Sequence, residues 1–551
     1  MYQIRNQRII TAAVFALTIF AQCVLFHYLV YKEILMSTLW HAPEDFFRFY
    51  LPAASMSVLF AGLVLLFKNR WWTVVVSLIT DVWIFANLWY YRANSMLIDQ
   101  FTVKMAGNLN GFWDSIFALI RPADTVFILL TIILIITIVF TNNGSKALRL
   151  SIICIMLSLI MGLANGVLLA RKYGNDISYL NPFKIYDINF GRNYLQEHTV
   201  IHHIAYTLGT MIAGTEDTKY TLTQDETNKV LNFINQSDGN TPEAKHPIVI
   251  CIIESLNSFA IKEDIMPNLW SFVANNEHIL FAPNITSMVK GGESADGQML
   301  ILSGLPPVAQ GAACLRFPLN TYPSIPKLYK STSAIFPHDL DVWNQAIMSQ
   351  AYSIAKNETA SDNDKELFAK AISRTKENDF VMMLTASTHI PCVKYADSST
   401  ISIPDTIPSL LKNYLKSANV LDQSIKILID EISTDKRLSE STIIITGDHN
   451  LPAPGDEYFN HAYNYSRFIP LIIYSPEITQ RTIINDTCYQ IDIYPTLLHL
   501  IGCEDYYWKG FGVNLLDSSA RLNRPITPEE AYDLSDKLIR ADYFKNQQIS
   551  K

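Results

Sequence analysis

The chain has 551 residues, more than one ordinary hydrophobic core accommodates, so we expect at least two folding units. Hydrophobic residues make up 49% of the chain, charged residues 17%, and the formal net charge is −8. Nucleic-acid binding needs a basic face, so this charge balance argues against nucleic acid as a partner. The seven cysteines show no CxxC spacing, and a zinc knuckle or a thioredoxin-like site is therefore not indicated.

The first third of the chain holds five apolar runs that approach or exceed the roughly 17 to 25 residues needed to cross a bilayer. They cover Ile9–Tyr31, Phe49–Phe67, Trp71–Tyr91, Thr125–Thr141 and Leu150–Ala170. These runs predict a five-helix transmembrane domain in residues 1–172. Basic residues flank the first run and occupy the short links after the second and fourth, so the positive-inside rule places these ends in the cytoplasm. We therefore expect a multi-pass protein of the cell (inner/cytoplasmic) membrane whose remaining chain is extracytoplasmic.

Two ionisable residues lie inside these runs, His27 in the first and Asp81 in the third. An ionisable group at membrane depth is costly, and its default interpretation is functional. A polar contact between helices is the alternative, and the sequence leaves both open.

The rest of the chain divides into three segments by composition. Residues 173–245 are polar and aromatic and are expected to form a juxtamembrane connector, with a capped helix at Thr223–Asn235. In residues 246–517 apolar strands alternate with helices, which favours an α/β domain with a mainly parallel sheet between helices. Residues 518–551 are expected to form a C-terminal helical tail. The predicted strands lie near Ile248–Ile253, Ile279–Phe281, Ser333–Phe336, Phe380–Leu384, Thr442–Thr446 and Phe468–Tyr474, and the predicted helices near Met266–Asn275, Ile325–Lys330, Asp364–Ser373, Ile407–Ile432 and Tyr489–Ile501.

Several side chains that suit chemistry follow the ends of predicted strands. Glu254, His389 and the pair Asp448-His449 occupy such positions, and ligands of open α/β sheets bind beyond the carboxyl ends of the strands. Carboxylates with an imidazole suit Zn²⁺ or Mn²⁺. Ser294 follows two glycines and precedes an apolar run that predicts a helix. A helix N-terminus favours an anion, and a metal beside this hydroxyl would make it a nucleophile.

Six motifs follow one another along the chain. They are Glu254 after the first strand, the turn Gly291–Ser294 leading to Leu302–Pro306, Trp343-Asn344, Thr388–Pro391, Gly447–His449 and Asp492–Leu497. In this order they resemble the motifs of the membrane-bound alkaline phosphatase/sulfatase superfamily. More narrowly, they are similar to those of the lipoteichoic acid synthase-like phosphoglycerol and phosphoethanolamine transferases, which carry five N-terminal membrane helices before an extracytoplasmic catalytic domain.

The resemblance implies a function and a role for each matching residue. One divalent cation, Mn²⁺ or Zn²⁺, would be held by the metal ligands Glu254, Ser294, Asp448 and His449. Ser294 would also attack the phosphorus of a phospholipid donor, and an envelope glycan or lipid acceptor would then resolve the phosphoserine. His389 would bind the phosphoryl oxygens or protonate the leaving oxygen. The expected substrate-binding residues are His461, a second phosphate or metal contact, and His338, Asp341 and Trp343 around the head-group pocket.

Two departures from related patterns limit this interpretation. Gln345 follows Trp343-Asn344, where the phosphoglycerol transferases carry an arginine, and a neutral amide cannot replace a bidentate guanidinium. The donor and acceptor therefore stay open. The residues after Ser294 lack the proline and arginine of the sulfatase nucleophile motif, which argues against sulfate-ester hydrolysis. The alternatives are a metal-dependent phosphatase, phosphodiesterase or sulfatase-family hydrolase, and a non-catalytic membrane receptor.

Overall fold

The computed structural model describes most of the chain as two compact units. One lies within residues 1–215 and the other within residues 216–551. The predicted connector, residues 173–245, is therefore divided between the units, and the limits of the four predicted domains stay a prediction. The described residues are 2–30, 43–94, 97–98, 100–104, 117, 119–141, 147–172, 177–180, 198–213, 220–235, 241–309, 311–390, 392–451 and 466–547.

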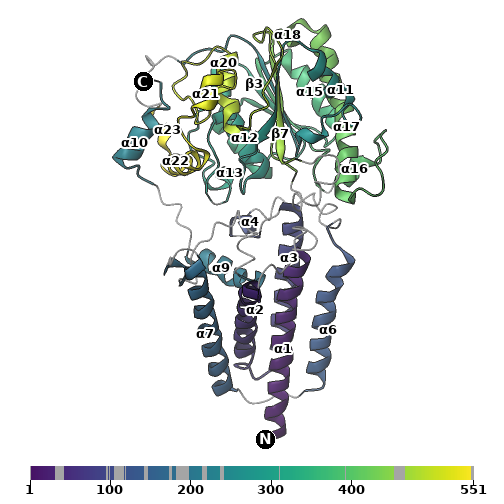
Figure 1. The fold of residues 1–551 in the computed structure, drawn as a ribbon, viewed down its shortest axis with the longest axis vertical. Coiled ribbons are helices and arrows are strands. Elements are labelled where there is room, and N and C mark those ends of the chain that lie inside the picture. The colour runs from purple at the N-terminus through teal and green to yellow at the C-terminus, as the bar shows by residue number, and fades with distance from the viewer. Residues whose placement is uncertain are drawn as a thin grey trace. The chain divides into compact units, whose positions relative to one another are not determined.

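The first unit is helical (Figure 1), and four of its helices contain a stretch long and apolar enough to cross a membrane. These stretches are Gln7–Leu29, Trp72–Arg92, Pro122–Val139 and Leu148–Arg171, so four of the five predicted apolar runs form candidate spans within the described residues. The remaining run lies in α2, whose apolar part, Tyr50–Val64, is shorter, and a fifth crossing stays a prediction. The helices are α1 (Tyr2–Leu29), α2 (Pro43–Val64), α3 (Trp72–Asn94), α4 (Gln100–Lys104), η3 (Pro122–Asp124), α6 (Thr125–Val139), α7 (Leu148–Lys172), η4 (Ile177–Leu180) and α9 (Val200–Ala213).

Asp81 of α3 joins three helices of this unit by buried hydrogen bonds. Gln22 of α1 donates its Nε2 hydrogen to Asp81 Oδ1 at 2.5 Å, and Thr131 of α6 donates to Asp81 Oδ2 at 2.7 Å. This geometry matches the interpretation of Asp81 as a polar contact between helices. The other ionisable residue, His27, has its Nδ1 3.0 Å from the carbonyl oxygen of Cys23, one turn earlier in α1.

The second unit is built on one nine-stranded sheet. Its order is β4, β3, β5, β1, β6, β7, β2, β8, and β9 pairs with β2. Only β7 runs antiparallel to its neighbours, so the predicted mainly parallel sheet is confirmed. The strands are β1 (Ile248–Ile253), β2 (Ile279–Thr286), β3 (Thr332–Phe336), β4 (Lys356–Thr359), β5 (Phe380–Leu384), β6 (Thr442–Gly447), β7 (Phe468–Tyr474), β8 (Thr482–Ile483) and β9 (Cys488–Tyr489). All six predicted strands are present, and the short β4, β8 and β9 were not predicted.

Helices cover both faces of this sheet, as Figure 1 shows. One face carries α12 (Glu293–Ser303), α13 (Ala313–Arg316), α20 (Ile493–Leu500) and α22 (Pro528–Arg540), and the other carries α11 (Pro267–Asn275), α15 (Asp364–Thr375), α16 (Val393–Ala396) and α17 (Ser409–Thr434). With both faces covered, every residue of β1, β3, β5 and β6 is buried, which explains their continuous apolar sequences. The remaining helices are α10 (Gln224–Leu231), η6 (Ser258–Ala260), η7 (Ile325–Leu328), η8 (Val342–Asn344), α14 (Gln345–Tyr352), α18 (Lys436–Ser439), η9 (Gln490–Asp492), α21 (Ser518–Leu522) and α23 (Tyr543–Gln547).

Predicted helices are present with shifted ends. The capped helix of the connector is α10, where Thr223 and Glu226 form a capping box. The segment predicted as a helix at Ile325–Lys330 forms only the 3₁₀ turn η7, because Pro326 at its start and the extended Tyr329 at its end leave room for a single turn. The tail holds three helices, α21, α22 and α23.

Asp492 ties the C-terminal segment to the core of the second unit. Its carboxylate is fully buried and accepts two hydrogen bonds of 2.7 Å from Arg524. It also accepts the backbone N–H groups of Tyr489 at 2.8 Å and Val513 at 3.0 Å. Four donors therefore depend on one side chain.

We predict that Asp492→Ala lowers the stability of the second unit by about 3 kcal/mol or more, since it leaves a part-buried guanidinium and two backbone donors unpaired. The measurement is the thermal unfolding midpoint of the purified full-length protein. Asp517→Ala is the matched control, because it removes an exposed helix cap and costs about 1 kcal/mol. Equal losses for the two variants would contradict the structural role of Asp492.

Candidate functional site

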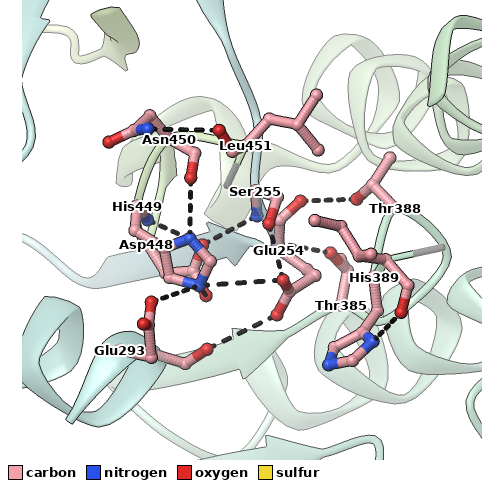
Figure 2. A network of polar contacts seen from close by, with 12 residues as sticks. Glu254, Ser255, Glu293, Thr385, Thr388, His389, Asp448, His449, Asn450 and Leu451 are labelled. Atoms are coloured by element: carbon pink, nitrogen blue, oxygen red, sulfur yellow. Dashed lines mark hydrogen bonds and ion pairs between the residues drawn. The ribbon is translucent and has the colours of Figure 1, made fainter. Parts of the chain in front are cut away.

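Three side chains at the carboxyl edge of the sheet form a compact polar group (Figure 2). Glu254 follows β1, and Asp448 and His449 follow β6. The two strands are parallel neighbours, with Ile253 opposite Gly447, so their ends meet at one edge. Glu254, Asp448 and His449 are buried, and each offers a ligand atom within 4.8 Å of the others. This group could hold a metal ion.

Two glycines permit the close approach of backbone around this group. A Cβ on Gly447 would lie 2.5 Å from the carbonyl oxygen of Leu256, and a Cβ on Gly297 would lie 2.5 Å from the carbonyl oxygen of Asp448. Real side chains do not tolerate such distances. Gly447 therefore lets the segments after β1 and β6 come together, and Gly297 lets α12 pack on Asp448.

Hydrogen bonds orient the three ligands. Asp448 Oδ1 accepts the backbone N–H groups of Ser255 at 2.8 Å and His449 at 2.7 Å, and Ser255 Oγ donates to Glu254 Oε1 at 2.7 Å. The Nδ1 atom of His449 lies 3.0 Å from the carbonyl oxygen of Asn450. Because a carbonyl oxygen can only accept, Nδ1 carries a hydrogen, and Nε2 faces the carboxylates as the atom available to a metal.

Ser294 lies beside the same group. It is the second residue of α12, and its Oγ donates to Glu254 Oε2 at 3.4 Å. The turn before it is fixed by Asp296, whose Oδ2 accepts the N–H groups of Lys290 and Gly292, both at 2.9 Å. The predicted helix start after the glycines is thus present, with the hydroxyl in its first turn.

The group holds more negative charge than a buried site tolerates. Burial raises the pKa of Glu293 to about 7 and that of Asp448 to about 6. Burial also raises the pKa of Glu254, but the positive charges of His449 and His389 outweigh it and hold that pKa below its usual value. Although burial lowers the pKa of His449, the surrounding carboxylates raise it to about 10. The ring thus supplies positive charge where the carboxylates converge.

The loop after β5 holds the backbone of Glu254 from its other side. Thr385 Oγ1 accepts the N–H of Glu254 at 3.1 Å, and Thr388 Oγ1 donates to its carbonyl oxygen at 2.5 Å. The loop itself is anchored by the buried Asp364, which accepts from the N–H of Ala386 at 3.0 Å and from the hydroxyl of Ser387. His389, which follows Thr388 in this loop, is exposed and lies beside Glu254 in Figure 2.

The other predicted substrate-binding residues are His338, Asp341 and Trp343, which follow β3, and His461. His338, after β3, stacks on Phe336 with ring centroids 6.1 Å apart, and burial lowers its pKa although the charge of Glu254 acts in the opposite direction. Trp343 packs against the core, and Asp341 is exposed. No hydrogen bond or ion pair joins these three to the metal group within the described part of the chain. His461 lies outside the described residues.

Two residues near the site were not predicted from the sequence. Glu293 directs its carboxylate toward His449, with Oε2 3.7 Å from Nε2. Its position directly before Ser294 was the available signal. Gln490 donates its Nε2 hydrogen to the carbonyl oxygen of Asp448 at 2.6 Å and accepts the N–H of Met288 at 3.0 Å. A glutamine between a short strand and a helix carries no such signal.

Two family models match the chain in succession. The lipoteichoic acid synthase N-terminal domain matches residues 1–200, and the sulfatase family matches residues 249–503. Among curated relatives, lipoteichoic acid synthase 2 of Bacillus subtilis (strain 168) is 26% identical over 514 residues, which cover 83% of this chain and 76% of the relative.

Two solved structures are each similar to more than half of the chain. The lipoteichoic acid synthase LtaP from Listeria monocytogenes has a TM-score of 0.46 and 18% identity, with 60% of this chain and 98% of that chain covered. The Streptococcus pyogenes phosphoglycerol transferase GacH, solved with sn-glycerol-1-phosphate, has a TM-score of 0.41 and 17% identity, with 58% and 90% covered. On the sequence matches, the chain is a lipoteichoic acid synthase-like member of the alkaline phosphatase/sulfatase superfamily, with a lipoteichoic acid synthase N-terminal domain.

Proposed function

We propose that this protein is a membrane-anchored, metal-dependent phosphoglycerol transferase that moves the head group of a phospholipid to an envelope glycan or lipid through Ser294. The observation that carries the proposal is the hydroxyl of Ser294 at the start of α12, hydrogen-bonded to a carboxylate of the metal group. The family membership supports the reaction class. A phosphoethanolamine-type head group is the alternative donor group.

The residues present fit one divalent cation. Around His449 Nε2, Asp448 Oδ2 lies at 3.4 Å and Glu254 Oε1 at 3.7 Å. Two ligands of one tetrahedral metal at about 2.1 Å are separated by about 3.4 Å, so these atoms need little movement to share an ion. Oxygen donors with one imidazole suit Mn²⁺ or Zn²⁺. When bound, the cation would lower the pKa of the serine hydroxyl and offset negative charge on the phosphoryl oxygens.

The chain's own groups then account for the transfer. Ser294 Oγ attacks the phosphorus, the bond from phosphorus to the diacylglycerol oxygen breaks, and the serine becomes a phosphodiester. The N-terminus of α12 favours the phosphoryl negative charge beside Ser294. His389, exposed beside Glu254, would protonate the leaving diacylglycerol oxygen. In the second half, an acceptor hydroxyl attacks the same phosphorus and Ser294 leaves, so no net hydrolysis occurs.

The first unit, which holds the candidate membrane spans, supports the proposal that the donor is a lipid. Four candidate spans are consistent with a multi-pass membrane protein, which would keep the catalytic unit near a lipid substrate. The arrangement of basic residues favours an extracytoplasmic catalytic unit. Gln345, at the start of α14, is buried and neutral, so it offers no positive charge to a glycerophosphate head group.

We predict that Mn²⁺ or Zn²⁺ raises the thermal unfolding midpoint of the metal-free full-length protein. At a hundredfold excess over the dissociation constant, binding stabilises the folded state by about 2.7 kcal/mol, and chelation removes the gain. Glu254→Gln should lose most of the shift, because it removes a ligand carboxylate. If neither ion shifts the midpoint of the wild-type protein, the metal assignment is wrong.

We also predict that Ser294→Ala abolishes head-group transfer from labelled phospholipid, while the other three ligands still bind the cation. Peptide mapping of wild-type protein incubated with lipid should find a glycerophosphate mass on Ser294. Ser303→Ala is the control, because this serine of the same helix only donates to a carbonyl oxygen in its own helix. Wild-type turnover by Ser294→Ala would rule out Ser294 as the nucleophile.

The same assay separates transfer from hydrolysis. With an acceptor present, a transferase moves the label to the acceptor, whereas a phosphodiesterase releases free glycerophosphate at an unchanged rate. A label that appears only as free glycerophosphate would favour the hydrolase. If the wild-type protein forms neither labelled acceptor nor free glycerophosphate, and Ser294→Ala leaves the cellular phenotype unchanged, a non-catalytic receptor would be favoured.

A further inference from the structure

Glu293 is the first residue of α12, directly before Ser294. Figure 2 shows its side chain pointing toward the ring of His449. The side chain is 19% exposed, compared with 11% for Glu254, 6% for His449 and 2% for Asp448. Glu293 is therefore the most accessible carboxylate of the group.

Glu293 lies as close to His449 Nε2 as Glu254 of the candidate metal group does. Its Oε2 lies 3.7 Å from His449 Nε2, which equals the distance from Glu254 Oε1 to that atom. A separation of this size is that of two ligands on one metal. Glu293 does not belong to the three residues whose ligand atoms all lie within 4.8 Å of one another, so its accessible side chain must rotate to complete the set.

The backbone and the charge of Glu293 both call for a compensating interaction. Its φ of 43° is left-handed, a conformation that costs a non-glycine residue about 1–3 kcal/mol and persists mainly at functional sites. Among the described residues, the carboxylate has an ion pair with His449 and no hydrogen bond. The charges of three other carboxylates, Asp296, Asp448 and Glu254, oppose its own. A cation held between Glu293, Asp448 and Glu254 would offset part of this repulsion.

We propose that Glu293 is a further ligand of the cation, in addition to Glu254, Ser294, Asp448 and His449. Four oxygen-bearing residues and one imidazole then surround the ion. A five-donor, oxygen-rich set favours Mn²⁺, which takes higher coordination numbers, over Zn²⁺, which prefers four ligands in protein sites. The inference needs the cation of the proposed function but not the transfer reaction.

The test is the dissociation constant of Mn²⁺ and of Zn²⁺ for the metal-free full-length protein, measured by competition with a chelator. Glu293→Gln should weaken Mn²⁺ binding by about tenfold or more, in the range found when groups around a metal are removed. It should weaken Zn²⁺ binding less, so the preference for Mn²⁺ falls. Glu263→Gln, which removes the same charge from an exposed position, should change neither constant.

Two further variants distinguish direct metal ligation by Glu293 from a through-space effect of its charge and from relief of backbone strain. Salt screens charges only weakly at a site this buried, so the discriminating variant is Glu293→Asp, which keeps the charge but shortens the side chain by one methylene. A through-space effect would leave its Mn²⁺ binding near the wild-type value, whereas loss of a metal–carboxylate bond would weaken it. Glu293→Gly relieves the backbone strain, so it should raise the unfolding midpoint of the metal-free protein while weakening Mn²⁺ binding as Glu293→Gln does.

Wild-type constants in Glu293→Gln, or a loss in Glu293→Gln that Glu293→Asp does not share, would overturn the inference. Either result would leave the proposed transferase intact if Ser294→Ala still abolishes transfer. Weakened Mn²⁺ binding combined with full transfer by Ser294→Ala would instead support the ligand and refute the function.

Discussion

The mutual repulsion of buried carboxylates is the constraint on which the rest of the second unit depends. Two unit charges about 4 Å apart repel by about 4 kcal/mol in a protein-like dielectric, so a chain that places two carboxylates together needs a compensating positive charge or a shared proton. Here Glu254 and Asp448 are set at adjacent strand ends by the β1–β6 pairing, with Ile253 opposite Gly447. The sheet thus brings together side chains that would otherwise separate, and His449 between them supplies the positive charge.

The surrounding structure holds these side chains mainly through their backbone. Thr385 and Thr388 bind the N–H and carbonyl oxygen of Glu254, so these two hydrogen bonds hold the residue without involving its carboxylate. Gln490 joins the carbonyl oxygen of Asp448 to the N–H of Met288, a few residues before the turn that carries Ser294. One amide therefore couples the metal group to the nucleophile, and a displacement of either segment moves the other.

Site residues could be predicted from the sequence where they lie at the end of a regular strand. Long buried strands ending in a carboxylate or an Asp-His pair could be recognised because apolar runs and polar ends differ sharply. The edge strand β4 could not, since Lys356–Thr359 is polar and partly exposed and takes its place by pairing with β3. Gln490 acts through two backbone groups more than 40 residues distant. Glu293 adjoined a predicted site residue, but its left-handed backbone, which turns the carboxylate inward, is a tertiary property.

The membrane unit has more specific packing than a tether requires. A single apolar helix suffices to anchor a domain, yet Asp81 links α1, α3 and α6, and Arg92 of α3 binds Asp124 before α6 through two hydrogen bonds of 2.8 Å. On α2, Gly62 lies so close to α7 that a Cβ would meet Cys154 at 3.0 Å. Buried polar contacts and small residues fix the register of helices where hydrophobicity alone cannot, because lipid is as apolar as the helices. The helices therefore form one packed body.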